Sequence, residues 1–275
     1  MEKIKALIVS GVLTIEHNYR ESEERIRTVL ESTGRFDVRV TEEFRGATME
    51  TVKGYDLLIY NYDGKSMPTD RYQRLDPGAE ETLFRFVREG GGFVIHHSAS
   101  ILDPGLPEEY YKIWGYYIPA EKCRRCPQDD LTAKVVYGDP ITEGLSPTFL
   151  CPTDDLFGGG EQYPGTNPQT LATLYDDVNF YKVDWWPPKH HPVHIPDGDL
   201  NKLPGVNRDV PVAWKNTYGK GRVFGCSIGH GIDTFRRFDF LGLYVRGCEW
   251  AATGEVTLGK PDRSGDNRLK PWPFY

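Results

Sequence analysis

Apolar and polar residues fall into alternating blocks along the first hundred residues, and these blocks predict strands and helices in turn. Short apolar runs bounded by turn residues predict buried strands at residues 5–10, 36–40, 55–60 and 93–96. Helical spacing of apolar residues predicts helices over residues 19–33, closed by Gly34, and from Asp76 to the glycine triplet at 90–92. Repeated strand–helix–strand units favour a parallel sheet with right-handed crossovers.

This regular alternation stops in the middle of the chain. Residues 103–207 hold Pro, Gly, Tyr and Trp in irregular order, with strand-like pieces at 133–136 and 171–174. Order returns with a predicted hairpin of residues 211–214 and 223–226 and a predicted helix over 238–252. We therefore predict an α/β fold with a single doubly wound, mainly parallel sheet of the flavodoxin-like type. Long irregular insertions are expected to pack around its carboxyl edge.

The predicted domain covers residues 1–258 and leaves a C-terminal tail of residues 259–275. That tail ends with Trp272, Phe274 and Tyr275. Because rings of this size favour burial, we expect the tail to dock either on its own subunit or in a subunit contact. The second alternative predicts a homo-oligomer.

Composition and charge narrow the possible partners. The chain has 33 Lys and Arg against 40 Asp and Glu, a net charge of −7, and its basic clusters are no longer than two residues, which argues against a nucleic-acid partner. The first apolar run, residues 6–9, is too short for a signal peptide or a membrane span, so we expect a cytoplasmic protein with no membrane partner. Aromatic residues make up 13% of the chain, and many lie in loops, where flat rings suit sugars.

The cysteines do not indicate a disulfide framework, because five is an odd number in a large chain. Cys123 and Cys126 have the spacing of half a zinc site, but no second pair completes four ligands.

Candidate chemistry gathers where predicted strands end. The strand at 93–96 runs into His97 and Ser98, His17 follows the first strand, and His230 follows the strand at 223–226. Ligands of open parallel sheets bind beyond the carboxyl ends of the strands, so we expect these side chains to meet in one cleft. Histidine together with a carboxylate serves acid–base chemistry near neutral pH.

Asp155 is the predicted carboxylate of this site, although a one-residue change of loop register would put Asp154 in its place. The predicted catalytic residues are therefore His17, His97, Asp155 and His230. The same imidazoles of His17, His97 and His230 could instead bind zinc or a similar divalent ion.

A second histidine cluster lies in a Trp-Pro-rich stretch. His190, His191 and His194 follow Trp185 and Trp186. Pro192 argues against a helix that would pair two of the histidines. We favour a loop over the cleft, in which Trp185, Trp186 and His191, together with Ser98, bind substrate; a purely structural loop is the alternative.

Cofactor motifs are missing from the sequence. The glycines at 90–92 enter a strand, whereas a dinucleotide fingerprint leaves a strand and opens a helix, so NAD binding is disfavoured. No phosphate-loop pattern surrounds Lys220 and Arg222, and we expect Arg222 to cap carbonyls or pair with an acid.

Short motifs spread over almost the whole chain carry a family resemblance. They are Glu16-His17-Asn18-Tyr19, residues 33–38, 55–58 and 86–92, His97-Ser98-Ala99, residues 139–145, 211–214 and 218–224, Gly229-His230 and Glu249-Trp250-Ala251. In this order and spacing they resemble the ThuA-like (trehalose-utilisation) family, whose fold is related to class I glutamine amidotransferases. The resemblance implies that the three histidines line a common cleft and that the function lies in carbohydrate catabolism. Asp154-Asp155-Leu156-Phe157 departs from the family's Asp-Glu-x-Tyr, so substrate choice does not transfer.

Glutamine amidotransferase activity itself is excluded by residue type. That chemistry needs a cysteine nucleophile at a strand-to-helix turn, and the corresponding turn here offers His97 and Ser98. Serine hydrolase chemistry is disfavoured because the G-x-S-x-G elbow is absent.

Two functions remain open from the sequence. The first is an enzyme acting on a sugar or keto-sugar by His/Asp acid–base chemistry, with or without a divalent metal; isomerase, lyase and hydrolase are its alternatives. The second is a non-catalytic sugar-binding or assembly module on the same scaffold. In both, the expected partner is a small carbohydrate.

Overall fold

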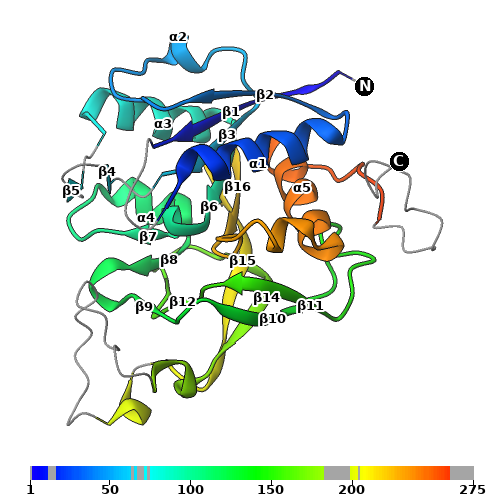
Figure 1. The fold of residues 1–275 in the computed structure, drawn as a ribbon. Coiled ribbons are helices and arrows are strands. Elements are labelled where there is room, and N and C mark those ends of the chain that lie inside the picture. Colours follow the sequence, from blue (N-terminus) through cyan, green and yellow to red (C-terminus); the bar gives the residue numbers. More distant parts are fainter. Residues whose placement is uncertain are drawn as a thin grey trace.

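A nine-stranded sheet forms the centre of the molecule (Figure 1). The computed structural model describes residues 2–11, 17–62, 65–66, 71–72, 75–182, 199–203 and 205–260. The sheet has the strand order β11-β10-β14-β15-β16-β6-β3-β1-β2. Its strands are β1 (Ile4–Ser10), β2 (Phe36–Thr41), β3 (Leu57–Asn61), β6 (Gly92–His96), β10 (Asp129–Val135), β11 (Thr148–Asp154), β14 (Gln169–Asp176), β15 (Arg208–Tyr218) and β16 (Gly221–Cys226).

The prediction of a mainly parallel sheet was wrong, because the sheet is mixed. β2, β1, β3, β6 and β16 pair in parallel, whereas β16, β15, β14, β10 and β11 pair antiparallel. The antiparallel half comes largely from the segment that the sequence pattern left irregular. β10 alternates exposed and buried residues, as expected of antiparallel strands covered on one face, and lacks the continuous apolar run of the parallel strands.

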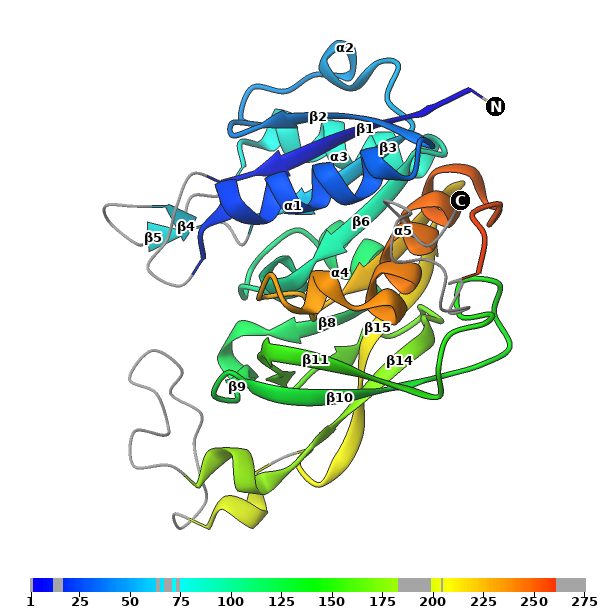
Figure 2. The same cartoon turned by 45° about the vertical axis from the view of Figure 1, so that its right-hand side comes forward.

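Helices cover both faces of the parallel half (Figure 2). The helices are α1 (Tyr19–Ser32), α2 (Met49–Val52), α3 (Pro77–Glu89), α4 (Glu108–Trp114) and α5 (Phe238–Thr253). Side chains of β1 alternate between the two faces: Ala6 and Ile8 share a hydrophobic cluster with residues of α1 and α5, and Leu7 and Val9 share one with residues of α3 and α4. This is the doubly wound arrangement that the sequence predicted.

Helix ends follow the local sequence signals. Asp76 caps α3 by accepting hydrogen bonds from the backbone N–H groups of Gly78 and Ala79, and Gly90, at φ 125°, ends this helix. Arg222 donates to the carbonyl oxygens of Trp250, Ala251 and Ala252 at the end of α5, so the predicted capping role of this arginine is confirmed.

Small sheets and turns complete the fold around the carboxyl ends of the parallel strands. The short strands are β4 (Lys65–Ser66), β5 (Arg71–Tyr72), β7 (Ile101–Leu102), β8 (Tyr116–Pro119), β9 (Arg124–Arg125), β12 (Phe157–Gly158) and β13 (Glu161–Gln162). The 3-10 helices are η1 (His97–Ser100), η2 (Ala120–Lys122), η3 (Val178–Tyr181), η5 (Leu200–Lys202) and η6 (Thr234–Arg236). β9 pairs with β12 and β8 with β7 and β13, so the described residues between 103 and 182 both extend the main sheet and form small sheets beside it. The domain boundary at residue 258 stays a prediction.

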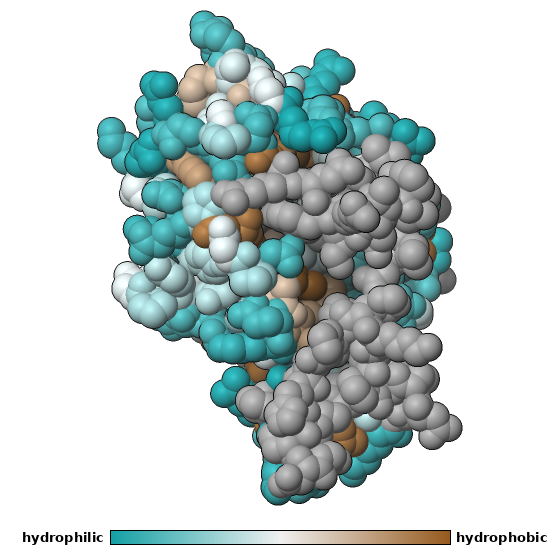
Figure 3. All heavy atoms as spheres, turned by 90° about the vertical axis from the view of Figure 1, so that its left-hand side faces the viewer, coloured by the Kyte–Doolittle hydropathy of each residue, from teal (hydrophilic) through white to brown (hydrophobic). Residues whose placement is uncertain are grey.

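Hydrophilic residues dominate the described part of the face shown in Figure 3, and the hydrophobic ones form small, separate areas. Within the described part of the chain, none of the helices has the length and apolar character needed to cross a bilayer. The apolar tail and its predicted subunit contact, residues 261–275, lie outside the described residues.

Candidate active site

A cavity of about 300 Å³ opens at the carboxyl ends of β1, β3, β6 and β16. This is the edge at which open sheets bind their ligands. The cavity is lined by His17, Asn18, Tyr19, Glu21, Ser22, Arg25, Asn61, His96, His97, Ser98, Gly229, His230, Gly231 and Ile232. The sequence-predicted His17, His97, Ser98 and His230 therefore share one cavity.

His97 is the first residue of η1 and stands at the strained turn that follows β6. Its φ is 49°, in the left-handed region that few non-glycine residues adopt, although histidine tolerates it better than most. A strained strand-to-helix turn is also the backbone geometry that presents the nucleophile of a hydrolase elbow. Here that geometry presents an imidazole, which is 4% exposed at the cavity floor.

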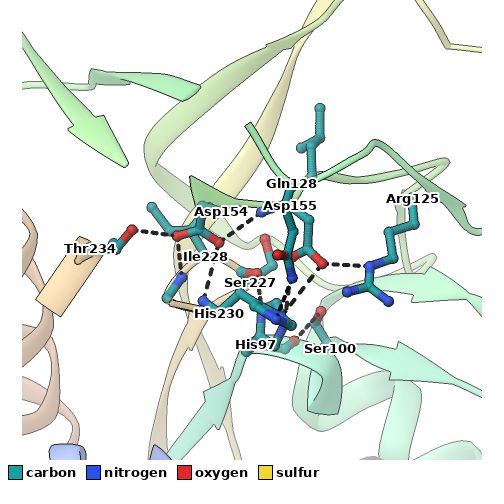
Figure 4. Close-up of polar contacts among 12 residues, drawn as sticks. His97, Ser100, Arg125, Gln128, Asp154, Asp155, Ser227, Ile228, His230 and Thr234 are labelled. Carbon is teal, nitrogen blue, oxygen red and sulfur yellow. Dashed lines mark hydrogen bonds and ion pairs between the residues drawn. The ribbon is translucent and has the colours of Figure 1, made fainter. Parts of the chain in front are cut away.

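The two imidazoles of His97 and His230 face each other. Nδ1 of His97 lies 2.9 Å from the carbonyl oxygen of Ser227, so this nitrogen carries the proton and donates it. Nε2 of His97 then holds a lone pair and accepts from Nδ1 of His230, 2.9 Å away. Nε2 of His230 lies 2.6 Å from the side-chain amide of Gln128, which closes the network (Figure 4).

Asp155 backs this pair of imidazoles with a fully buried carboxylate. Its Oδ1 lies 3.6 Å from Nε2 of His97, and its Oδ2 lies 3.6 Å from Nδ1 of His230. Oδ2 also accepts a hydrogen bond of 2.5 Å from Nε of Arg125, whereas Oδ1 accepts none from the described residues. The carboxylate therefore favours positive charge between the two rings.

Asp154, the register alternative to Asp155, makes different contacts. Its Oδ1 accepts from the backbone N–H of His230 at 3.2 Å and of Asp155 at 3.0 Å. Its Oδ2 accepts from Gly229 N–H at 2.9 Å and from the Thr234 hydroxyl at 2.8 Å (Figure 4). Asp154 thus holds the loop that carries His230, and one of its oxygens also lies within 4.8 Å of a nitrogen of His97. Burial, and then the charge of Asp155, raise its pKa to about 6.

His17 completes a triangle of imidazoles. It immediately precedes Asn18, the N-cap residue of α1. Its ring centre lies 5.1 Å from that of His97 and 5.4 Å from that of His230, whose centres are 4.9 Å apart. The convergence that the sequence predicted for the three histidines and Asp155 is therefore present in the structure.

Burial favours the neutral form of His97 and His17. It lowers the pKa of His97 well below the usual value, and the nearby imidazoles of His230 and His96 lower it further. The pKa of His17 is also lowered well below 6.5, first by burial and then by His97 and His230. Neutral imidazoles with available lone pairs can act as bases or as metal ligands.

Further polar side chains line the cavity beside the histidines. Asn61, at the end of β3, donates to the hydroxyls of Ser10 and Ser22. Arg25 of α1 donates to the carbonyl oxygen of His230 at 3.3 Å and pairs with Glu21. Sequence analysis missed Asn61, although a polar residue that ends a buried strand is the same signal that identified His97.

Arg125 and Gln128 were missed as well, and no local sequence signal marks them. They lie near the two cysteines whose spacing suggested zinc, but Cys123 and Cys126 are both buried and belong to neither group of potential metal ligands among the described residues. Burial raises the pKa of the Cys126 thiol, which keeps it protonated. The other predicted substrate-binding residues, Trp185, Trp186 and His191, lie outside the described residues.

Comparison with solved structures shows the same fold. A ThuA-like protein from Parabacteroides merdae matches with a TM-score of 0.72 and 23% identity, covering 95% of this chain and 94% of that one. A ThuA-like protein from Bacteroides uniformis matches with a TM-score of 0.63 and 18% identity, covering 94% of both chains. A β-galactosidase from Bacillus circulans sp. alkalophilus has a TM-score of 0.54 and 18% identity, and the match covers 94% of this chain but 32% of that one.

The family follows from the sequence itself. No curated protein matched the chain. Residues 5–251 match the sequence model of the ThuA family, which is described as trehalose utilisation. Because this match spans nearly the whole chain, the protein belongs to the ThuA family, and its membership implies a role in trehalose utilisation.

Proposed function

We propose that this protein is a cytoplasmic enzyme of carbohydrate catabolism that moves a proton on a sugar or keto-sugar at the cluster of His17, His97, His230 and Asp155. The observation that carries the proposal is the pair of imidazoles of buried His97 and partly buried His230, joined at 2.9 Å and backed by a carboxylate 3.6 Å from each. A base and an acid held this close can remove a proton from one substrate atom and supply one to another.

The reaction that suits this arrangement is proton abstraction next to a carbonyl group. One neutral imidazole takes the proton from the carbon beside the carbonyl of a keto-sugar. The electron pair of the broken C–H bond forms the C=C bond of an enediol as the acid partner protonates the carbonyl oxygen. Return of a proton to the former carbonyl carbon, with loss of the proton from the other hydroxyl oxygen, completes an isomerisation without any oxidant or reductant. Asp155 stabilises the imidazolium that forms during this transfer.

The cavity wall supports a carbohydrate as the substrate. Hydroxyl, amide, guanidinium and carboxylate groups of Ser22, Asn61, Arg25 and Glu21 line it beside the histidines. Such groups can exchange hydrogen bonds with sugar hydroxyls, and a volume of about 300 Å³ is at the lower end for ligand cavities, which suits a single sugar ring.

The test is exchange of the substrate proton with solvent, followed by NMR in D₂O. The substrates are trehalose and a keto form of trehalose with one ring hydroxyl oxidised. We expect the wild-type chain to exchange the proton next to the carbonyl, and His97→Asn and His230→Asn to lose at least about 100-fold in exchange rate. Asparagine tolerates the positive φ of His97, so the first variant should keep the turn.

Tyr163→Phe is the matched control, because Tyr163 lies away from the cluster. This substitution removes a single hydroxyl, which donates a hydrogen bond to Glu108. This variant should exchange the proton at the wild-type rate. Sugar binding by wild type without proton exchange or turnover would overturn the proposed enzymatic function and favour a non-catalytic binding module.

A further inference from the structure

We propose that His17, His97 and His230 bind one divalent transition-metal ion at the cavity floor, with Asp155 as the adjacent carboxylate. The site deepens the proposed function, and only its role in the reaction rests on that function. One nitrogen from each of the three histidines lies within 4.8 Å of the other two. Imidazole nitrogens are preferred ligands of Zn²⁺ and its neighbours in the first transition row.

The spacing of the side chains fits an ion. Ligands at Zn–N distances of 2.0–2.1 Å around a tetrahedral centre are about 3.3 Å apart. Nε2 of His97 and Nδ1 of His230 are 2.9 Å apart, and each lies 3.6 Å from an oxygen of Asp155. Small side-chain movements would therefore place an ion between these groups, in place of the proton that the two rings share.

The outer partners also match those of metal-binding histidines, which usually donate their second N–H group to a carbonyl or an amide. His97 donates from Nδ1 to the carbonyl oxygen of Ser227, which leaves Nε2 for the ion. His230 has Gln128 at Nε2, and a turn of that amide presents its oxygen to the ring N–H and leaves Nδ1 for the ion.

The contacts of Asp155 support the ion site independently. Its Oδ1 is buried and accepts no hydrogen bond from the described residues, although it faces the histidine pair. Arg125 pairs with this carboxylate through Oδ2, so Oδ1 is the oxygen left to face an ion. The alternative trio of His97, Asp154 and Asp155 is less suitable, because both oxygens of Asp154 already accept two hydrogen bonds each.

The open side of the ion faces substrate, because all three histidines line the cavity. Catalytic zinc sites likewise keep one position for water or substrate. Held by the three imidazoles, an ion would polarise the carbonyl oxygen of a keto-sugar and would make a bound water acidic enough to supply the base, in place of a free imidazole.

The experiment measures ion binding to the full chain after removal of metal with a chelator. Zn²⁺ is titrated by calorimetry, and Co²⁺ is followed by its visible absorption, which reports coordination by nitrogen ligands. We expect one ion per chain. His17→Asn, His97→Asn and His230→Asn should each weaken binding beyond the roughly 10–100-fold that loss of an outer partner costs, and Gln128→Ala should fall within that range.

Tyr163→Phe is again the control, since Tyr163 bonds to Glu108 and does not line the cavity, and it should bind the ion like wild type. Circular dichroism shows whether each variant is folded. Absence of a stoichiometric ion in wild type, or unchanged binding in folded His97→Asn and His230→Asn, would overturn the site. Proton exchange by a wild-type chain that binds no ion overturns the site and leaves the proposed function standing. A bound ion without proton exchange or turnover supports the ion site and overturns the proposed function.

Discussion

The Nε2 atom of His97 and the Nδ1 atom of His230 lie 2.9 Å apart, although the two residues are 133 positions apart in the chain. β6 and β16 are parallel neighbours with Cys226 opposite His96, so the residues that follow both strands emerge at the same edge. The strained turn at His97 and the loop held by Asp154 then aim the two rings at each other. The contact thus depends on the sheet topology, on the turn at His97 and on the loop held by Asp154. The contributions of the turn and the loop can be tested separately.

Loss of the guanidinium beside Asp155 should destabilise the fold. Arg125→Met leaves a fully buried carboxylate without its hydrogen-bonded cation, and breaking a buried pair in this way costs about 3 kcal/mol of unfolding free energy. Urea denaturation at pH 7.5 measures the difference from wild type.

The double variant Arg125→Met/Asp155→Asn removes the orphaned charge as well. It should be more stable than Arg125→Met alone by at least about 1 kcal/mol, because the two side chains are coupled. Strictly additive effects of the two substitutions would contradict a direct interaction.

Asp154→Asn should lower the unfolding free energy more than its small change in size suggests. An amide nitrogen cannot accept the two hydrogen bonds that one carboxylate oxygen now accepts, and bonds to charged groups contribute about 1.5–3 kcal/mol each. At pH 7.5, above the pKa of about 6 of this carboxyl group, we expect a loss of about 2–4 kcal/mol in unfolding free energy.

Thr234→Val provides the comparison for Asp154→Asn. It deletes a single donor to Asp154 and should cost about 1–2 kcal/mol while leaving the backbone of Gly229 and His230 bonded. Equal losses in the two variants would show that Asp154 does not organise the His230 loop.

The sequence predicted the parallel half of the fold because its signals are local. Asp76 followed by Pro77, and a glycine at the end of a helical pattern, mark helix ends whatever the rest of the chain does. The direction of β10, β11 and β14 could not be found in this way. Strand direction depends on which strand lies alongside, and the half-exposed pattern of β10 looks irregular when it is judged by apolar runs.

The same distinction applies to the site. Histidines at strand ends could be assigned, since the carboxyl edge of a parallel sheet collects them. Asp154 and Asp155 could not be separated, because Thr153, at φ 50°, interrupts the alternation of side chains just before them. Arg125 depends on the pairing of β9 with β12, in which it lies opposite Phe157, and that long-range contact has no local signature.

Acid should destabilise the fold through His96. Burial lowers the pKa of His96 from 6.5 to about 3, so between these values the unfolded chain binds more protons than the folded chain. Its stabilising contribution is complete above pH 6.5 and is lost as the pH falls toward 3, with a slope of up to about 1.4 kcal/mol per pH unit.

Urea unfolding of wild type and His96→Leu at several pH values from 7.5 to 4 tests this origin. Leucine is close in size to histidine and suits the neighbouring rings of Phe235 and Tyr244. The variant should lose part of the acid dependence, whereas parallel curves for the two chains would assign that dependence to other groups.

A methyl group at Gly229 should damage the site more than the same group at an open position. Gly229 has φ 107°, a conformation costly for any other residue, and an added Cβ would lie 3.0 Å from Cζ of Phe240 and 3.1 Å from Cε1 of His96. Gly138 has nearly the same φ, 104°, with nothing within 4 Å of its Cβ position. Gly138→Ala therefore reports backbone strain alone, about 1–3 kcal/mol of unfolding free energy. Gly229→Ala should cost at least about 1 kcal/mol more than Gly138→Ala, because crowding adds to the strain.

Gly229→Ala should also slow proton exchange on the keto-sugar, because the backbone N–H of Gly229 and that of the adjacent His230 both donate to Asp154. Equal stability losses with unchanged exchange in both variants would show that the position of His230 does not depend on this glycine.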